Sequence, residues 1–338
     1  MRGVELKERY EEDLFLVRGA LAWTALLTLC VGLLVLPYVV RNYVLFTFSL
    51  IAVNAVIAVG LNLLVGYTGQ ISLGHAGFVA IGAYTAGLVT AKLPWPEPAA
   101  ALGLSWIAAL IAAGVVAAIF GFLVGLPALR LTGPYLTIAT LGFGIAVHQV
   151  LTNWDRLSGG RTGLFLPRLF LGPWRLDDRQ LYYLTVVVAG LLIWVASNLA
   201  RSHVGRAFVA IRDSDIAAEV MGVNLTRYKT LAFAVSAAYA GIGGAMLAFI
   251  LRYLEPQLFT LFESIYYFSM IVIGGLGTIP GSVLGAAVLT VLPQQLAGLR
   301  EWLPVVYGAT IIFVMAVEPR GLYGRWMRIK LWFKTWPF

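Results

Sequence analysis

The chain is dominated by apolar runs of about twenty residues, separated by short polar or glycine-rich breaks. A helix rises about 1.5 Å per residue, so a run of this length spans the hydrocarbon core of a bilayer. The pattern predicts an all-α polytopic membrane protein with about ten transmembrane segments, within a range of eight to eleven. The expected spans are 19–40, 43–65, 71–91, 104–126, 133–151, 180–199, 229–251, 258–274, 281–297 and 303–317.

These spans predict a single transmembrane domain over residues 19–317, with tails at 1–18 and 318–338. Two connecting segments are long. One, at 152–179, is punctuated by Gly and Pro, and the other, at 200–228, is charged. The N-terminal tail has no small-residue cleavage site, so we expect an uncleaved first span rather than a removed signal peptide.

Composition and charge agree with a membrane location. Only 12% of the residues are charged and 60% are hydrophobic, whereas soluble domains carry about 25% charged residues. With both termini cytoplasmic, fifteen of the 24 Lys and Arg residues fall inside, as the positive-inside rule requires. Five basic residues in 152–179 oppose this orientation, and the basic cluster after residue 318 favours it. The basic residues form no continuous stripe with aromatic residues, which disfavours nucleic-acid binding.

The spans contain few groups that could do chemistry. Glu263 and Glu318 lie at predicted span ends, and His75 and His148 are the titratable candidates at depth. Proton- and sodium-coupled carriers usually keep intramembrane carboxylates or histidine relays, so we expect transport energy to come from outside the membrane. A lone histidine more often packs than binds a ligand. With one cysteine, Cys30, and no HExxH spacing, we expect no metal site and no catalytic residues.

Two glycine-rich segments stand out, at residues 66–77 and 274–281. One interpretation is close helix packing through small residues. The other is a pair of broken helices whose backbone groups face a cavity, and paired interruptions in two halves of a chain indicate a transport site. Gln70, Ser72 and His75 are polar residues among these glycines, and they favour the interpretation that the segments face a cavity. The candidate translocation-path residues are Gly69, Gln70, Ser72, Gly74, His75, Gly77, Gly274, Gly275, Gly277 and Thr278.

The two segments are weakly similar. A shift of 208 residues aligns Gly66, Gly69, Ile71 and Gly77 with Gly274, Gly277, Ile279 and Gly285. Because the chain contains 36 glycines, duplication and chance both remain open.

The charged segment 200–228 predicts a short helix. Asp213 or Ser214 can cap its start, and Asp215 is favourable at the positive end of the helix dipole. Gly222 suits the left-handed position that ends a helix. A solvated surface helix and a docking helix for a soluble partner both fit this pattern.

Five ordered motifs carry a resemblance to a known family. The loop GRAFVAIRDSDIAAEVMG (205–222) closely resembles the cytoplasmic loop of branched-chain amino acid ABC permeases. The others are GLNLLVGYTGQISLGHAGFVAIGAY (60–84), GPYLTIATLGFG (133–144), SGG-x-x-GL (158–164) and GGLGTIPGSVLGA (274–286). Together they resemble the M-type permease subunit (LivM family) from about residue 50 to 324, whereas residues 1–40 carry no resemblance.

The resemblance implies a permease subunit of an ATP-driven importer for branched-chain or similar neutral amino acids, in a prokaryotic plasma (inner) membrane. The implied partners are an H-type permease, two cytoplasmic ATPase subunits and an extracytoplasmic substrate-binding protein. The sequence has no GxxxxGK[ST] phosphate loop, so ATP and Mg are expected on the partners and no cofactor on this chain. A urea or short-amide permease, which shares these motifs, and a stand-alone secondary transporter or channel are the alternatives.

The resemblance also assigns positions in the loop. Ala217, Ala218, Glu219 and Gly222 stand where the importer coupling motif has its Ala-rich helix and glycine, and the two alanines offer a small, flat surface. The full set of ATPase-coupling candidates is Arg212, Asp213, Asp215, Ala217, Ala218, Glu219 and Gly222. The later Ile-x-Leu-Pro of the broader motif is absent. After GFG the family usually has an acidic and then a basic residue, and here Ile145 and His148 occupy those positions.

Overall fold

The structure is a computed structural model that describes residues 20–91, 104–131, 133–167, 169–171, 174–295, 302–318 and 321–335. It divides into two units, residues 1–45 and 46–338. The predicted tail 1–18 and the side chain of Cys30 lie outside the described part. The first unit contains α2 (Ala20–Val39) and the start of α3 (Asn42–Thr68).

Each of the ten predicted apolar runs coincides with one described helix. After α3, the second unit contains α4 (His75–Ala91), α6 (Leu104–Ala128), α7 (Pro134–Asn153), α9 (Asp178–Arg201), α12 (Leu225–Leu251), α13 (Leu261–Gly274), α14 (Ile279–Gln295) and α15 (Leu303–Val317). Within the described residues, α3, α6, α7, α9 and α12 are long and apolar enough to cross a membrane, and α4, α13, α14 and α15 are shorter apolar helices. The fold is therefore that of an all-α polytopic membrane protein, as predicted.

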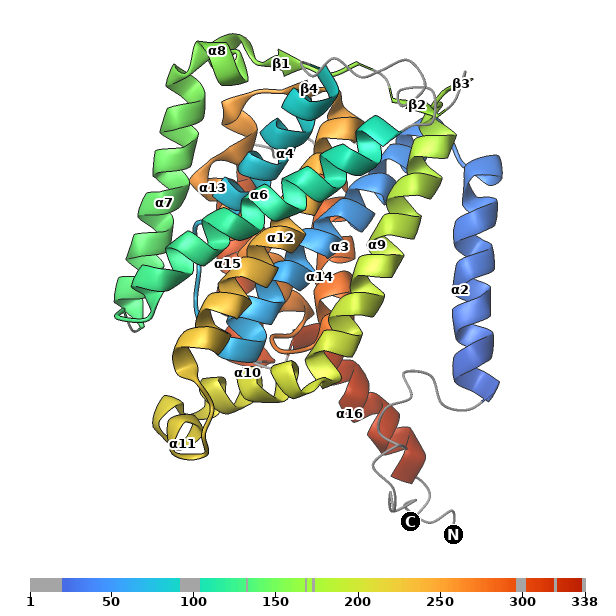
Figure 1. Ribbon diagram of the computed structural model, residues 1–338. Coiled ribbons are helices and arrows are strands. Elements are labelled where there is room, and N and C mark those ends of the chain that lie inside the picture. The colour runs from blue at the N-terminus through green and yellow to red at the C-terminus, as the bar shows by residue number, and fades with distance from the viewer. Residues whose placement is uncertain are drawn as a thin grey trace. The chain divides into compact units, whose positions relative to one another are not determined.

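Shorter elements connect these helices. They are α8 (Asp155–Ser158), η1 (Gly160–Thr162), β1 (Leu164–Phe165), β2 (Phe170–Leu171), β3 (Trp174–Arg175), α10 (His203–Asp213), α11 (Asp215–Val220), β4 (Tyr253–Leu254) and η2 (Pro256–Phe259). Helix α16 (Gly321–Thr335) follows α15. Strand β1 pairs antiparallel with β4, and β2 with β3. Figure 1 shows α10 and α11 at one end of the second unit and α8, β1 and β4 at the other.

Two helix starts differ from the predictions by four residues. The span predicted from residue 71 begins at His75, because the glycine-rich segment before it is not helical. Helix α12 begins at Leu225 rather than 229, because the Asn224 side chain caps it by accepting a hydrogen bond from the Arg227 backbone N–H at 2.9 Å. Lys229, expected at the boundary, therefore lies inside the helix and is only 8% exposed.

Small residues bring the central helices together. Helix α12 packs against α4 and α6, which cross it in Figure 1. A Cβ atom at Gly82 would collide with the backbone of Gly241, and one at Gly244 would collide with the Val79 carbonyl. Lipid provides no hydrophobic force between helices, so close backbone contact of this kind supplies much of the packing energy.

Helices α6, α7 and α9 also have apolar faces directed outward. Ile111 of α6, Ile138 of α7 and Val187 of α9 are among many large apolar side chains that are well exposed. Such exposure is unfavourable in water and expected against lipid or a membrane partner.

Candidate functional site: two helix breaks beneath a surface helix pair

The first glycine-rich segment is a true helix break. Helix α3 ends at Thr68 because Gly69 adopts a left-handed conformation with φ of 71°. The N–H of Gly69 donates to the Val65 carbonyl at 3.1 Å, and that of Gln70 to the Leu64 carbonyl at 3.3 Å. Residues 69–74 are non-helical, and α4 then begins.

The second segment is a similar break between α13 and α14. Helix α13 ends at Gly274, and Gly277 has φ of 73°. Gly69 and Gly277 are aligned by the shift of 208 residues and share a left-handed conformation, which favours duplication over chance.

The two breaks contact each other through Asn62, a fully buried residue of α3. Its side-chain nitrogen donates to the Thr278 carbonyl at 2.9 Å and to the Ser282 hydroxyl at 2.7 Å. Its side-chain oxygen accepts from the Gly277 N–H at 2.9 Å. Asn62 was not among the residues predicted for the site. The available signal was an amide side chain within the apolar part of the 60–84 motif.

The first break is also packed against α7 and α13. A Cβ atom at Gly74 would collide with the Thr140 carbonyl. The Thr140 hydroxyl accepts a hydrogen bond from the Leu73 N–H at 3.1 Å. The Ala76 N–H donates to the Ser264 hydroxyl at 3.0 Å. Helix breaking and close packing, weighed above as alternatives, thus occur in the same segment.

Most candidate path residues are buried in this conformation. Gly69 is exposed and Gly277 and Thr278 are half-buried, whereas the buried candidates are Gln70, Ser72, Gly74, His75, Gly77, Gly274 and Gly275. The Ser72 hydroxyl makes no hydrogen bond to any described residue.

The segment 200–228 folds into two helices rather than one. Helix α10 buries Ala207, Phe208 and Ile211. The Ser214 side chain caps α11 by accepting the Ala217 N–H at 3.2 Å, so Ser214 and not Asp213 is the cap. Asp213 instead ends α10.

The end of α11 follows the prediction at Gly222, whose φ of 86° is left-handed. The prediction for Ala218 was wrong, because this residue is 3% exposed and faces the protein. The large exposed side chains are instead Ile216, Val220 and Met221, at 79%, 81% and 82%. Residues i and i+4 share one helix face, so Ile216 and Val220 form an outward apolar surface that the sequence analysis missed.

Arg212 connects α10 to the breaks. Its Nη1 donates to the Gly66 carbonyl at 3.0 Å, and Nε and Nη2 donate to Asp213 Oδ1 at 3.2 and 3.1 Å. A second ion pair joins α11 to α12, with Lys229 Nζ 2.7 Å from Asp215 Oδ2. Among the coupling candidates, Arg212 therefore contacts the first glycine-rich segment directly.

The 158–164 motif lies at the opposite end of the second unit. Gly159, Gly160 and Gly163 have positive φ, and the Gly160 N–H donates to the Ser158 hydroxyl at 3.0 Å. This turn leads into β1, which pairs with β4. The motif thus shapes the loop and presents no reactive constellation.

Ile145 and His148 occupy the positions where the resemblance implies an acidic and a basic residue. Ile145 is exposed on α7. His148 Nδ1 lies 3.0 Å from the Pro256 carbonyl, a distance at which the ring nitrogen donates a hydrogen bond. Histidine here holds α7 to η2. No group of His, Cys, Asp and Glu in the described part of the chain could hold a metal ion.

Comparison with known proteins identifies relatives. The family "Branched-chain amino acid transport system / permease component" matches residues 43–315. The high-affinity branched-chain amino acid transport system permease protein LivM of Escherichia coli (strain K12) is 33% identical over 331 residues, covering 90% of this chain and 75% of the relative. The permease protein LivH of Salmonella typhimurium is 28% identical over 287 residues, covering 80% and 91%. No solved structure matches the chain.

The family match extends from the start of α3 through most of α15 and contains both helix breaks, Asn62 and the α10–α11 pair. The chain therefore belongs to the permease-component family of branched-chain amino acid transport systems.

Proposed function

We propose that this chain is the transmembrane permease subunit of an ATP-driven ABC importer that moves branched-chain or similar neutral amino acids into the cell. One observation carries the proposal: Arg212 of the surface helix α10 donates to the Gly66 carbonyl at the first helix break. Asn62 joins the first break to the second. A displacement of α10 and α11 would therefore be transmitted to both helix breaks. The names of the relatives favour branched-chain amino acids over urea or short amides.

The proposed partners are a second, H-type permease, two cytoplasmic ATPase subunits that bind ATP and Mg, and an extracytoplasmic binding protein. The apolar surface of α11 supports a protein partner there. Ile216, Val220 and Met221 expose about four-fifths of their surface, and clustered apolar side chains of this kind mark interaction sites. We also propose a coupling role for Arg212 and Asp215, which is supported by the bond from Arg212 to Gly66 and the ion pair of Asp215 with Lys229.

The proposed location is a prokaryotic inner membrane, with both termini and the 200–228 segment cytoplasmic. Helix α16 supports this orientation, because its exposed side chains include Arg325, Arg328 and Lys330 and basic residues concentrate on the cytoplasmic side.

Reconstitution tests the proposed function. The chain, its second permease and the two ATPases are reconstituted in liposomes. ATP is enclosed in the lumen, on the side that α11 faces, and the binding protein is added outside. We expect uptake of radiolabelled leucine that requires ATP and binding protein, and no uptake by this chain alone. Uptake by the chain alone would establish a secondary transporter or channel, and uptake of urea but not leucine would establish the amide alternative.

We predict the orientation of three single cysteines in a Cys30→Ser background. Met221→Cys and Lys330→Cys should react with a membrane-impermeant maleimide only from the cytoplasmic side, and Phe165→Cys only from outside. All three native side chains are exposed. Reaction of positions 165 and 221 from the same side would show that the number of spans between them is wrong.

The translocation path is proposed to include the two breaks near the interface with the second permease. The substrates are zwitterions with apolar tails. The path must therefore offer polar contacts to an ammonium and a carboxylate group without binding either of them tightly. Free backbone N–H groups at a helix start can hold a carboxylate, and free carbonyls can accept an ammonium. Gln70, Ser72, His75 and Thr278 add polar groups at the breaks.

Ser72→Cys distinguishes a path from simple packing. The native side chain is fully buried here. If the break lines the path, we expect the thiol to react with an aqueous maleimide in one nucleotide state and to be protected in another. State-independent protection of cysteines at 72 and 278, in a complex that still transports, would contradict the placement.

A further inference from the structure

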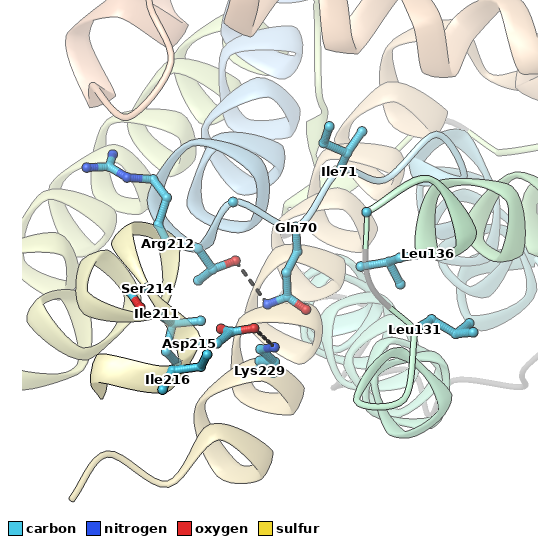
Figure 2. A pocket seen from close by; sticks show the side chains of 13 residues that line it. Gln70, Ile71, Leu131, Leu136, Ile211, Arg212, Ser214, Asp215, Ile216 and Lys229 are labelled. Atoms are coloured by element: carbon cyan, nitrogen blue, oxygen red, sulfur yellow. Dashed lines mark hydrogen bonds and ion pairs between the residues drawn. The ribbon is translucent and has the colours of Figure 1, made fainter. Parts of the chain in front are cut away.

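A cavity of about 350 Å³ lies between the first helix break and the α10–α11 pair. Its walls come from the end of α3 and the break, the α6–α7 connection, α10 and α11, and α12. Figure 2 shows Gln70, Asp215 and Lys229 close together on one side and Leu131 and Leu136 on the other. The polar groups are thus gathered on one side, where Ile211 and Ile216 lie beside them, and the other side is apolar (Figure 2).

Gln70 presents an unsatisfied acceptor at this cavity. The residue is 6% exposed, and its side-chain nitrogen donates to the Thr68 hydroxyl at 3.1 Å. Thr68 donates its own hydroxyl proton to the Leu64 carbonyl, so it can only accept from Gln70, and this determines the orientation of the amide. The Gln70 Oε1 atom then has no donor among the described residues, although buried polar atoms are normally paired.

Charged residues of both signs line the same cavity. Lys229 is buried and lies 2.7 Å from the Asp215 carboxylate, and Arg212 also lines the cavity. An inorganic anion would be repelled by Asp215 and would leave Gln70 Oε1 without a donor. A simple cation would be repelled by Lys229.

A small zwitterion with an apolar tail satisfies all of these groups. Its ammonium can donate to Gln70 Oε1 and to Asp215, and its carboxylate can accept from Lys229 (Figure 2). Its tail would contact Leu131 and Leu136. We propose that this cavity binds an apolar amino acid from the cytoplasmic side.

The cavity lies at the start of α11, so an amino acid bound in it would affect the position of that helix. Ser214, Asp215 and Ile216, at the start of α11, form part of the cavity wall. An amino acid held between Gln70 and Asp215 restrains α11 against the break, so accumulated product lowers ATP hydrolysis. This inference rests on the proposed function, because it takes α11 as the helix that contacts the ATPases.

The test uses the complete permease–ATPase complex in lipid nanodiscs without binding protein. We expect saturable binding of radiolabelled L-leucine and inhibition of basal ATP hydrolysis over the same concentration range. 4-Methylpentanoate and 3-methylbutylamine, which each lack one charge, should bind at least about tenfold more weakly, as expected for the loss of a charge-assisted hydrogen bond.

Two variants locate the site. Gln70→Met keeps the side-chain volume but removes the acceptor, and Leu131→Trp fills the apolar side. Each should weaken leucine binding at least about tenfold. Gln149→Met is the matched control, because Gln149 is exposed on α7 and does not line this cavity, and it should bind leucine normally.

Absence of saturable binding to the wild-type complex, or equal binding by both variants and the wild type, would overturn the inference. These outcomes are separable from failure of the proposed function. A wild-type complex that imports leucine with its binding protein but binds none without it overturns only this site. A complex that imports no amino acid overturns the proposed function.

Discussion

Replacing Asn62 with leucine is expected to lower the melting temperature of the purified complex by about 6 °C or more. Leucine fits the volume but removes three hydrogen bonds, to the Thr278 carbonyl, the Ser282 hydroxyl and the Gly277 N–H. A buried polar group left without its partner costs about 1–3 kcal/mol, so the total loss is on the order of 3 kcal/mol. The measurement is thermal unfolding in detergent, together with the amount of assembled complex in the membrane.

Asn54→Leu is the matched control for this variant. Asn54 is a buried amide on the same helix and makes one side-chain hydrogen bond, to the Thr290 hydroxyl at 2.9 Å. It should show about one third of the effect, since hydrogen-bond losses of this kind are similar in size. Equal melting temperatures for the Asn62 variant and the wild type would show that the two breaks are not held together by this residue.

Gly222→Val is expected to reduce leucine import at least about tenfold while basal ATP hydrolysis continues and the complex stays in the membrane. The φ of 86° places residue 222 in the left-handed region, where a β-branched side chain costs on the order of 1–2 kcal/mol. Apart from its chain neighbours, no described residue lies within 4 Å of a Cβ built there, so the effect comes from the backbone at the end of α11. Import and ATPase activity of the same proteoliposomes are compared.

Glu219→Lys tests the surface of the same helix by charge. Glu219 is exposed on α11, so the substitution changes the contact with a partner without disturbing the interior. We expect the same separation of ATP hydrolysis from import.

Gly222→Asn is the control for the backbone effect. Asparagine tolerates the left-handed conformation better than other non-glycine residues, so this variant should keep most of its import. If the valine and lysine variants both retain normal import and normal substrate-stimulated ATPase activity, α11 has no coupling role.

The sequence alone determined the elements that depend on local physics. Twenty apolar residues can form one membrane-spanning helix whatever surrounds them, so all ten predicted runs match described helices. Gly222 was predicted to be left-handed because a glycine after a short helix suits that conformation. For the glycine-rich segments the sequence left close packing and helix breaks as alternatives, and the structure shows both in the first segment.

The tertiary structure decided which distant groups meet. Asn62 bonds to Gly277 across 215 positions, and Arg212 bonds to Gly66 across 146. Periodicity within one segment carries no information about a contact of this kind, because the partner is chosen by how separate helices pack. The inward position of Ala218 and the outward position of Ile216 were likewise set by where α11 docks. The composition of a helix limits its possible faces, and only its neighbours determine which face is buried.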